Sequence, residues 1–341
     1  MPPIADPRAF LETLFSVAVA AADPEKVLAA NLPEKPKGRT VVIGAGKGAA
    51  QMARAFERLW DAPLTGVIVT RYGYAVACER IDVLEAAHPV PDDSGLLASG
   101  RLMAAVRGLT ADDLVVALVC GGGSALLPAP AGDLTLADEI AVNKALLASG
   151  APISAMNAVR KQVSRIKGGR LAALAHPARV VSLVVSDIPG DNPALVASGP
   201  TIADATTRAD ALRLIERYRL DLPDAVMRHI RDGKDEPPLP SDACFARNEV
   251  RLVASAAVSL EAAAEAARKA GVEAVILSDA IEGEAAEVGR VHAAIAAEVV
   301  RRNRPFRKPV VILSGGETTV TIKGKGKGGR NGEFLLSFAC A

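Results

Sequence analysis

Short apolar runs alternate with amphipathic stretches through most of the chain. The runs are rich in Val, Ile and Leu and end near glycine or polar residues; they lie at 40–43, 66–70, 81–84, 114–119, 179–186, 250–254, 273–278 and 310–313. Between them, apolar and small residues recur at helical spacing, as at 10, 11, 14, 17, 18 and 21. The pattern predicts buried strands that alternate with helices, which is typical of an α/β fold.

Two domains are expected, because 341 residues exceed the usual size of one. The segment GKDEPPLPS at 233–241 reads as a linker. We therefore expect a Rossmann-like three-layer N-terminal domain over 1–240, and a second α/β domain over 241–341 that begins with the strand at 250–254. The chain stops within an apolar helix, LLSFACA, so we expect the second domain to be truncated and incomplete.

Composition narrows the class of protein. Hydrophobic residues make up 50% of the chain, which argues against disorder, and aromatic residues only 3%, which argues against stacking of single-stranded nucleic acid. The net charge of +1 gives no basic footprint for DNA or RNA. The chain shows neither a signal peptide nor an apolar run long enough for a membrane span, so we expect a cytoplasmic protein.

A glycine turn follows the first strand, with the sequence GAGKG at 44–48. We expect the backbone around Gly46 to approach an anion closely and Lys47 to reach a phosphate or carboxylate. The spacing fits G-x-G-x-x-A, but Arg71 stands near the place where a nicotinamide fingerprint has an acid. Strand–helix packing alone is the alternative explanation for these glycines.

A second glycine loop follows the run at 114–119. Gly121, Gly122, Gly123 and Ser124 could form a backbone nest for an anion, or only a sharp turn. The loop lacks the last glycine of the G-x-S-x-G elbow of serine hydrolases. His88, in AAHPVPD, is either a turn residue or a titratable site residue.

A cationic helix is expected over 154–167. It carries Arg160, Lys161 and Lys167 without an interleaved acidic residue. Such a cluster is either a solvated helix face or, because local counter-charge is missing, a binding surface for an anionic ligand.

Two aspartates follow the run at 179–186. Asp187 and Asp191 are suited to hold Mg²⁺ or to accept a hydroxyl proton, since ligands of open α/β sheets bind beyond the strand ends. A turn cap is the alternative. The loop KGKGKGGRNGE at 323–333 predicts a cationic clamp over phosphate, or a disordered hairpin tip.

Together these motifs resemble the glycerate 2-kinase family, whose C-terminal part is called the MOFRL domain. The resemblance covers nearly the whole chain and is carried by VVIGAGKGA, AAHPVPD, CGGGSALLPAP, MNAVRKQVSRIKGGRLA, VSDIPGDNPALVASGPT and LSGGETTVTIKGKGKGGRNGEF. Members of this family have often been labelled hydroxypyruvate reductases.

The resemblance implies transfer of the ATP γ-phosphoryl group to the 2-hydroxyl of D-glycerate with Mg²⁺, in a cleft between two α/β domains. Lys47 and Arg330 match catalytic positions, and Asp187 is expected to act with them. Gly332 stands where the family usually has Gln. Contacts to substrate or phosphate are expected from Gly46, His88, Gly121, Gly122, Gly123, Ser124, Asn157, Arg160, Lys161, Lys167, Asp191, Asn192, Glu317, Thr318, Lys325 and Asn331.

Two other functions stay open. An NAD(P)H-dependent hydroxypyruvate reductase would share the first glycine turn but would leave the loop at 323–333 unexplained. A non-catalytic protein that binds a sugar acid would use the same loops without turnover. The expected partners are a small acid and a nucleotide, with no nucleic acid and no membrane, and the chain is a possible homodimer.

Overall fold

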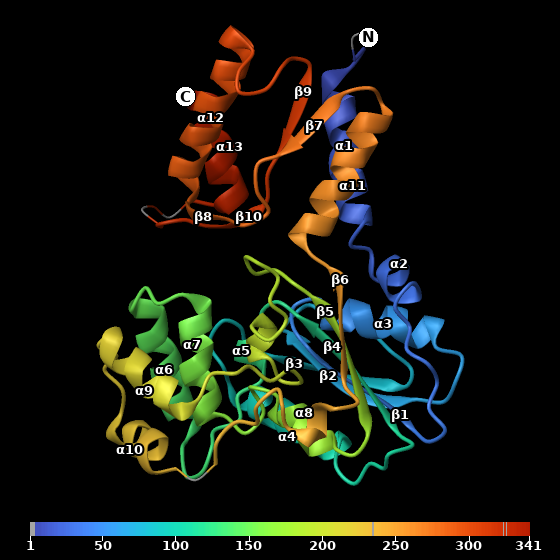
Figure 1. Cartoon of the computed structure of the whole chain (residues 1–341), viewed down its shortest axis with the longest axis vertical. Helices are drawn as coiled ribbons and strands as arrows, with labels where there is room; N and C mark the ends of the chain where they lie inside the picture. The colour runs from blue at the N-terminus through green and yellow to red at the C-terminus, as the bar shows by residue number, and fades with distance from the viewer. Residues whose placement is uncertain (1–3, 234, 323, 325) are drawn as a thin grey trace. The chain divides into compact units, whose positions relative to one another are not determined.

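The computed structural model describes residues 4–233, 235–322, 324 and 326–341. The chain divides into two compact units (Figure 1). The large unit consists of Pro24–Ser186 and Asn192–Val253. The small unit consists of the described parts of Met1–Asp23, Asp187–Asp191 and Ala254–Ala341. The α/β class expected from the sequence is confirmed in the large unit, where a sheet carries helices.

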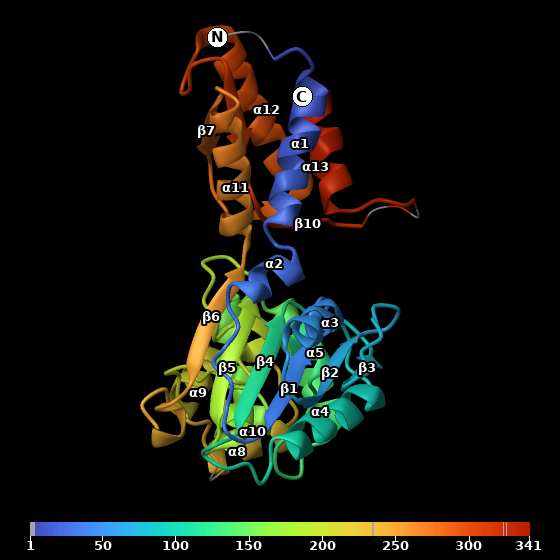
Figure 2. The same cartoon turned by 90° about the vertical axis from the view of Figure 1, so that its right-hand side faces the viewer.

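A six-stranded sheet forms the centre of the large unit, in the order β3-β2-β1-β4-β5-β6 (Figure 2). Its strands are β1 (Thr40–Ala45), β2 (Thr65–Arg71), β3 (Ile81–Ala86), β4 (Leu114–Cys120), β5 (Arg179–Val185) and β6 (Glu249–Ala254). The strands from β1 to β5 pair in parallel. Every residue of β1 and β4 is buried, which explains their continuous apolar runs, because both faces of a parallel sheet are covered.

Helices of the large unit connect and cover these strands. They are α2 (Pro24–Ala29), α3 (Ala49–Leu59), α4 (Asp93–Ala105), α5 (Gly123–Leu126), α6 (Leu136–Ala148), α7 (Ile153–Arg160), α8 (Arg170–Ala175), α9 (Arg208–Arg217) and α10 (Asp224–Asp232), with 3₁₀ turns at Lys161–Val163, Val196–Ser198 and Ala243–Phe245. The path from β1 through α3 to β2 runs in one direction across the sheet, and the path from β3 through α4 to β4 runs back. Right-handed crossovers of opposite direction place α3 and α4 on opposite faces, and the direction reverses between β1 and β4.

The sixth strand corrects one expectation. The sequence pattern predicts a strand at 250–254, and a strand is found there, but β6 lies beside β5 at the edge of the large sheet and does not begin a second one. Local periodicity identifies a strand without identifying its neighbour, which is a long-range contact. The division of the chain at residue 240 stays a prediction.

A helical layer beside the sheet has its own core. Buried side chains of α6, α7, α9 and α10 pack together, among them Val142, Val159, Ile215 and Ile230. Thr135 and Thr207 form capping boxes that satisfy backbone N–H groups at the starts of α6 and α9. This cluster holds α7, and with it Asn157 and Arg160, in a fixed position.

In the described residues, the small unit contains four helices and two short two-stranded sheets. The helices are α1 (Pro7–Ala20), α11 (Ala256–Lys269), α12 (Ala285–Arg302) and α13 (Arg330–Cys340); β7 (Glu273–Ile276) pairs in parallel with β9 (Val310–Leu313), and β8 (Ile281–Glu284) with β10 (Gly316–Thr319). Asp6 caps α1 through bonds from the N–H groups of Arg8 and Ala9, as its position before Pro7 predicts. Leu14 of α1 packs with residues of α11 and β9, so the first helix belongs to the same unit as Ala254–Ala341.

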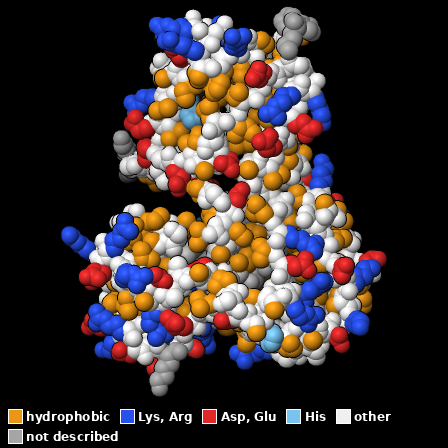
Figure 3. Space-filling view, viewed as in Figure 1, with side chains coloured by type: hydrophobic (Ala, Val, Ile, Leu, Met, Phe, Trp, Pro, Cys, Tyr) orange, Lys and Arg blue, Asp and Glu red, His pale blue; other side chains and the backbone are white. Residues whose placement is uncertain are grey.

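The surface carries both signs of charge. Lys and Arg side chains are interspersed with Asp and Glu on the visible face of each unit (Figure 3). None of the helices in the described part of the chain is long and apolar enough to cross a bilayer.

Candidate active site

The two glycine loops of the large unit meet where the direction of the sheet reverses. Lys47 follows β1, and Gly121 follows the neighbouring strand β4. The backbone N–H of Lys47 donates to the carbonyl of Gly121 at 2.9 Å, so the loops are bonded to each other. In open α/β sheets this position, beyond the carboxyl ends of the strands, is where ligands bind.

The first glycine turn uses its own N–H groups inside the protein. Gly46 donates to the carbonyl of Val69 at 3.2 Å, and Gly48 donates to Cys120 Sγ at 3.1 Å. With the Lys47–Gly121 bond, the three consecutive N–H groups of Gly46, Lys47 and Gly48 are occupied by protein acceptors. A Cβ on Gly46 would lie 2.4 Å from the carbonyl oxygen of Cys120, so glycine is required here by close packing.

The side chain of Lys47 remains directed toward the second loop. A Cβ on Gly122 would lie 2.9 Å from Lys47 Cε and 3.1 Å from His88 Nε2, so these two side chains converge over this glycine. Gly122 has a φ of 82°, a left-handed conformation that glycine adopts without strain. Within the described ranges of the chain, Lys47 has no carboxylate partner. The ammonium group of Lys47 therefore lies beside His88 and Gly122 without a carboxylate partner among the described residues.

His88 is neutral at physiological pH in this environment. Its ring is half-buried, and burial lowers its pKa below the ordinary value of 6.5. The positive charges of Lys47 and Arg71 lower this pKa further, since both disfavour a protonated ring. A neutral imidazole can accept a hydrogen bond from a hydroxyl group.

Ser124 begins a chain of polar contacts that leads away from the loop. Its hydroxyl is 2.8 Å from the hydroxyl of Ser198, which donates to Asn157 Oδ1 at 2.9 Å. Arg160 donates to the same oxygen at 3.1 Å and to Asn143 at 2.8 Å. Burial lowers the pKa of Arg160 to about 10, although the nearby charge of Glu139 opposes the shift. Asn157 and Arg160 thus fix the loop from behind.

Lys161 and Lys167 have acidic partners after all. The ammonium of Lys161 lies 2.6 Å from Asp204, and Lys167 forms a buried ion pair with Glu139 while donating to the carbonyl of Leu127 at 2.9 Å. The segment does lack local counter-charge, as the sequence indicates, but acids from distant positions in the sequence supply it. The expected helix over 154–167 is also shorter, since α7 ends at Arg160 and the chain turns inward there.

The aspartate loop after β5 is a short turn. The N–H of Asp191 donates to the carbonyl of Ile188 at 3.3 Å, and Asn192 Oδ1 accepts from Ala194 at 3.1 Å. Asp187 is exposed and Asp191 is half-buried. No group of three or more potential metal ligands occurs among the residues described. Asp187 and Asp191 nevertheless supply the ligand type that Mg²⁺ takes, since it commonly binds one or two carboxylates and completes its shell with water and phosphate.

A second set of expected site residues meets in the small unit. Arg330, at the start of α13, forms an ion pair with Glu317 and donates to the carbonyl of Thr318 at 3.2 Å, in each case through Nη1. Glu317, Thr318, Arg330 and Asn331 line a cavity of about 480 Å³. Lys325 lies outside the described residues.

Comparisons with known proteins agree with the motifs. Residues 10–231 match a family described as a domain of unknown function (DUF4147), and residues 310–341 match the MOFRL family. The chain is 40% identical to the glycerate 2-kinase of Pyrococcus horikoshii, over 95% of this chain and 77% of the relative. The chain belongs to the glycerate 2-kinase family. The crystal structure of glycerate kinase from Thermotoga maritima is similar with a TM-score of 0.85 at 34% identity, covering 97% of this chain and 79% of that one.

A different label also occurs in the glycerate 2-kinase family. A protein of Agrobacterium vitis that is labelled a hydroxypyruvate reductase is 53% identical, over 98% of this chain and 76% of that protein. The family therefore carries two functional names, and the chemistry of the site must decide between them.

Two polar residues of this glycerate 2-kinase family member were missed by sequence reasoning. Ser198 joins Ser124 to Asn157, and its only sequence signal is its place in the motif VASGPT. In the small unit, His292 Nε2 lies 3.1 Å from Ser314 Oγ, beside a cavity that Thr318 and Asn331 also line. No spacing in the sequence connects His292 with Ser314.

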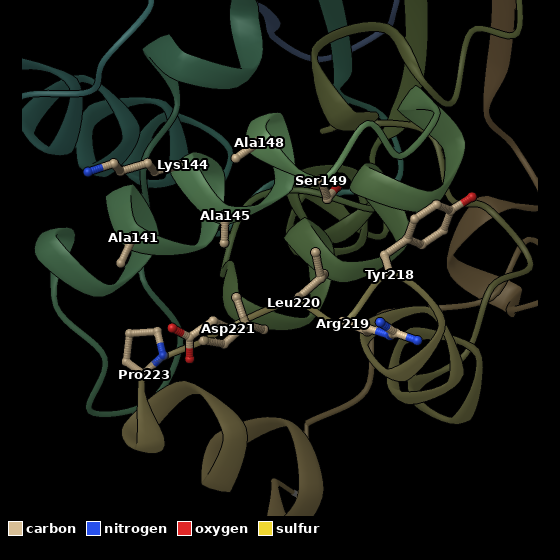
Figure 4. Close-up of a pocket in the computed structure, with 11 residues that line it drawn as sticks. Ala141, Lys144, Ala145, Ala148, Ser149, Tyr218, Arg219, Leu220, Asp221 and Pro223 are labelled. Atoms are coloured by element: carbon tan, nitrogen blue, oxygen red, sulfur yellow. The ribbon is translucent and has the colours of Figure 1, made fainter.

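A separate cavity of about 810 Å³ lies in the helical layer of the large unit (Figure 4). It is lined by α6 and by the segment between α9 and α10, and Lys144, Tyr218, Arg219 and Asp221 are among its residues. Its lining includes none of the described residues that the sequence assigned to the site. We do not place the reaction of the glycerate 2-kinase family there.

Proposed function

We propose that this chain transfers the γ-phosphoryl group of ATP to the 2-hydroxyl of D-glycerate and forms 2-phosphoglycerate, with Mg²⁺ held by Asp187 and Asp191. Membership of the glycerate 2-kinase family supports phosphorylation of glycerate in general. The observation that carries the proposal is Lys47, a cation without a carboxylate partner in the described part of the chain, placed beside neutral His88 and Gly122 at the reversal point of the sheet.

Phosphoryl transfer depends mostly on positioning and on stabilisation of charge on the transferring oxygens. Lys47 provides a point charge for this purpose, and Arg330 provides a planar guanidinium. Because both protein contacts of Arg330 use Nη1, its other nitrogens can donate to phosphate oxygens. Mg²⁺, when bound, would neutralise negative charge on the phosphates.

The second glycine loop would hold the acid or a phosphate. Gly121 is fixed by its bond from Lys47, and Ser124 is fixed through Ser198. Loops held in this way lose little entropy when a ligand binds, which favours affinity. We infer that the loop is a prepared surface against which Lys47 positions the substrate.

The deciding experiment is a coupled assay of ADP formation with D-glycerate, ATP and Mg²⁺. ADP that forms only when glycerate is present supports the kinase. Coupling the product to enolase, which acts on 2-phosphoglycerate and not on 3-phosphoglycerate, tests the position of the new phosphate. Absence of glycerate-dependent ADP at any Mg²⁺ concentration would contradict the proposal.

Hydroxypyruvate reduction is the second candidate, favoured by the label on the relative from Agrobacterium vitis. Dinucleotide enzymes bind pyrophosphate on the N–H groups of a glycine turn. In this chain Gly46, Lys47 and Gly48 donate those N–H groups to protein acceptors. Oxidation of NADH or NADPH that requires hydroxypyruvate would support the reductase. Binding of glycerate with neither activity would instead support a binding protein.

A further inference from the structure

Arg71 is the last residue of β2, near the two side chains that converge over Gly122. In the register of the sheet Arg71 is opposite Ala86, two residues before His88. The preceding residue, Thr70, donates its hydroxyl to the carbonyl of Lys47 at 3.3 Å. The backbone thus places Arg71 close to both Lys47 and His88, although it comes from a different strand from either.

The guanidinium of Arg71 is held in one orientation but is not neutralised. It stacks on the ring of Tyr74, 3.7 Å from the ring centroid. Its Nε is buried and has no hydrogen-bond acceptor. Across the described residues, Arg71 forms no ion pair. A buried donor without an acceptor is costly, so a site that holds one is suited to a ligand that supplies the acceptor.

Two acids on neighbouring segments, Glu85 of β3 and Asp92 before α4, are already occupied by other donors. Glu85 Oε1 accepts from the backbone N–H groups of Gly73, Tyr74 and Ala75 at 2.7–3.3 Å. Asp92 accepts from the hydroxyl of Tyr72 and from the N–H groups of Ala87 and Gly95. These carboxylates accept hydrogen bonds from the loop that carries Tyr74 and from nearby N–H groups. Among the described residues, neither forms an ion pair with Arg71. The loop after β2 therefore supports Arg71 through Tyr74 and leaves its positive charge without a carboxylate partner among the described residues.

We propose that Arg71 binds the carboxylate of the acid substrate through hydrogen bonds from its guanidinium. The proposal rests on the proposed kinase function. A guanidinium fixed by stacking offers a planar pair of donors, which matches a carboxylate in two-point contact. The carboxylate carbon of a 2-hydroxy acid is bonded to the carbon that bears the hydroxyl, so neutral His88 beside Arg71 can accept from that hydroxyl. Arg71 thus determines specificity for acids, while Lys47 acts on phosphate.

The test compares D-glycerate with glyceramide, its uncharged amide, as phosphoryl acceptors. Removal of the guanidinium in Arg71→Ala should lower kcat/KM for D-glycerate about a hundredfold, mainly through KM, and change the value for glyceramide less than about threefold. The KM for ATP should not change. Arg71→Lys, which keeps the charge but not the planar fork, should recover part of the loss. Arg101→Ala is the matched control, because Arg101 is an exposed arginine that pairs with Asp82.

Three results would overturn the proposal. An equal loss for the acid and the amide would assign Arg71 a structural role. A higher KM for ATP alone would assign it to a nucleotide phosphate. Unchanged kinetics would remove it from the site. If the wild-type chain forms no ADP, the kinase function fails, and calorimetric titration with D-glycerate then tests Arg71 independently: binding that Arg71→Ala abolishes supports the carboxylate contact, and no binding to the wild type refutes it.

Discussion

The cations after α7 have either a structural role or a ligand-binding role, and the buried ion pair of Lys167 and Glu139 allows the two to be tested. Lys167 is 1% exposed and Glu139 3% exposed. Glu139 also accepts from the N–H of Ala129 at 3.0 Å, and Lys167 donates to the carbonyl of Leu127. Replacing Lys167 with Met leaves a buried carboxylate without its cation. Breaking a buried pair in this way costs about 3–5 kcal/mol of unfolding free energy.

The assay is urea unfolding followed by the fluorescence of Trp60, the single tryptophan of the chain, which is buried in the core of the large unit. Lys167→Met should lower the unfolding free energy by about 3–5 kcal/mol. Adding Glu139→Gln should recover much of the loss, because the neutral amide still offers an acceptor to Ala129.

A matched control tests the same segment at an exposed position. Arg165→Met changes an exposed cation two residues before Lys167 and should alter stability by less than about 0.5 kcal/mol. If Lys167→Met lowered the unfolding free energy by less than about 1 kcal/mol and raised the KM for glycerate or ATP, the structural role would be refuted. Lys167 would then be an anion contact, as the sequence pattern first indicated.

Three further outcomes are expected. Lys47→Ala should lower kcat/KM for glycerate phosphorylation by about 10²- to 10³-fold, while Lys144→Ala, which removes an exposed lysine, should change it less than about twofold; wild-type activity in Lys47→Ala would exclude Lys47 from the reaction. Burial and neighbouring cations lower the pKa of His88 in the folded chain. Just below pH 6.5, the unfolded chain therefore binds a proton at His88 that the folded chain does not bind. The unfolding free energy should therefore rise with pH up to 6.5 and level off above it, and His88→Asn should flatten this slope in urea titrations from about pH 5 to 8; identical slopes in both proteins would contradict the shift. Gly46→Ala should lower the unfolding free energy by about 3 kcal/mol, since its Cβ would lie 2.4 Å from Cys120; a loss below about 1 kcal/mol would show that the turn relaxes.

The central strands were predictable because their pattern has a local cause. Parallel strands buried on both faces need continuous apolar runs, and β1, β4 and β5 fall within two residues of the predicted ranges. The start of α1 was also predictable, since Asp6 and Pro7 act within one turn of helix. The sheet to which β6 belongs was not predictable in this way, because pairing joins residues far apart in the sequence.

The acidic partners of the cations were the feature of the site that the sequence predicted least well. Lys161 pairs with Asp204 and Lys167 with Glu139, at separations of 43 and 28 residues. A helix pattern shows only partners three or four residues away. The absence of nearby acids around Lys161 was therefore a correct observation that did not support an unpaired cation. Lys47, in contrast, has no acidic partner in the folded structure either, because none of the described residues forms an ion pair with it.

The glycine loops show why a motif can predict topology without predicting a ligand. Gly46 is required because Cys120 packs against it, and a Cβ on Gly123 would lie 2.6 Å from the Cβ of Ala197. Both glycines are explained by contact between chain segments at the reversal point of the sheet. In our proposals, recognition depends on the side chains carried there, with Lys47 acting on phosphate and Arg71 on the carboxylate, while the N–H groups of Gly46, Lys47 and Gly48 donate to protein acceptors. A phosphate bound mainly by side-chain cations should lose affinity when those cations are removed and keep it when the turn glycines are replaced, provided that the fold survives.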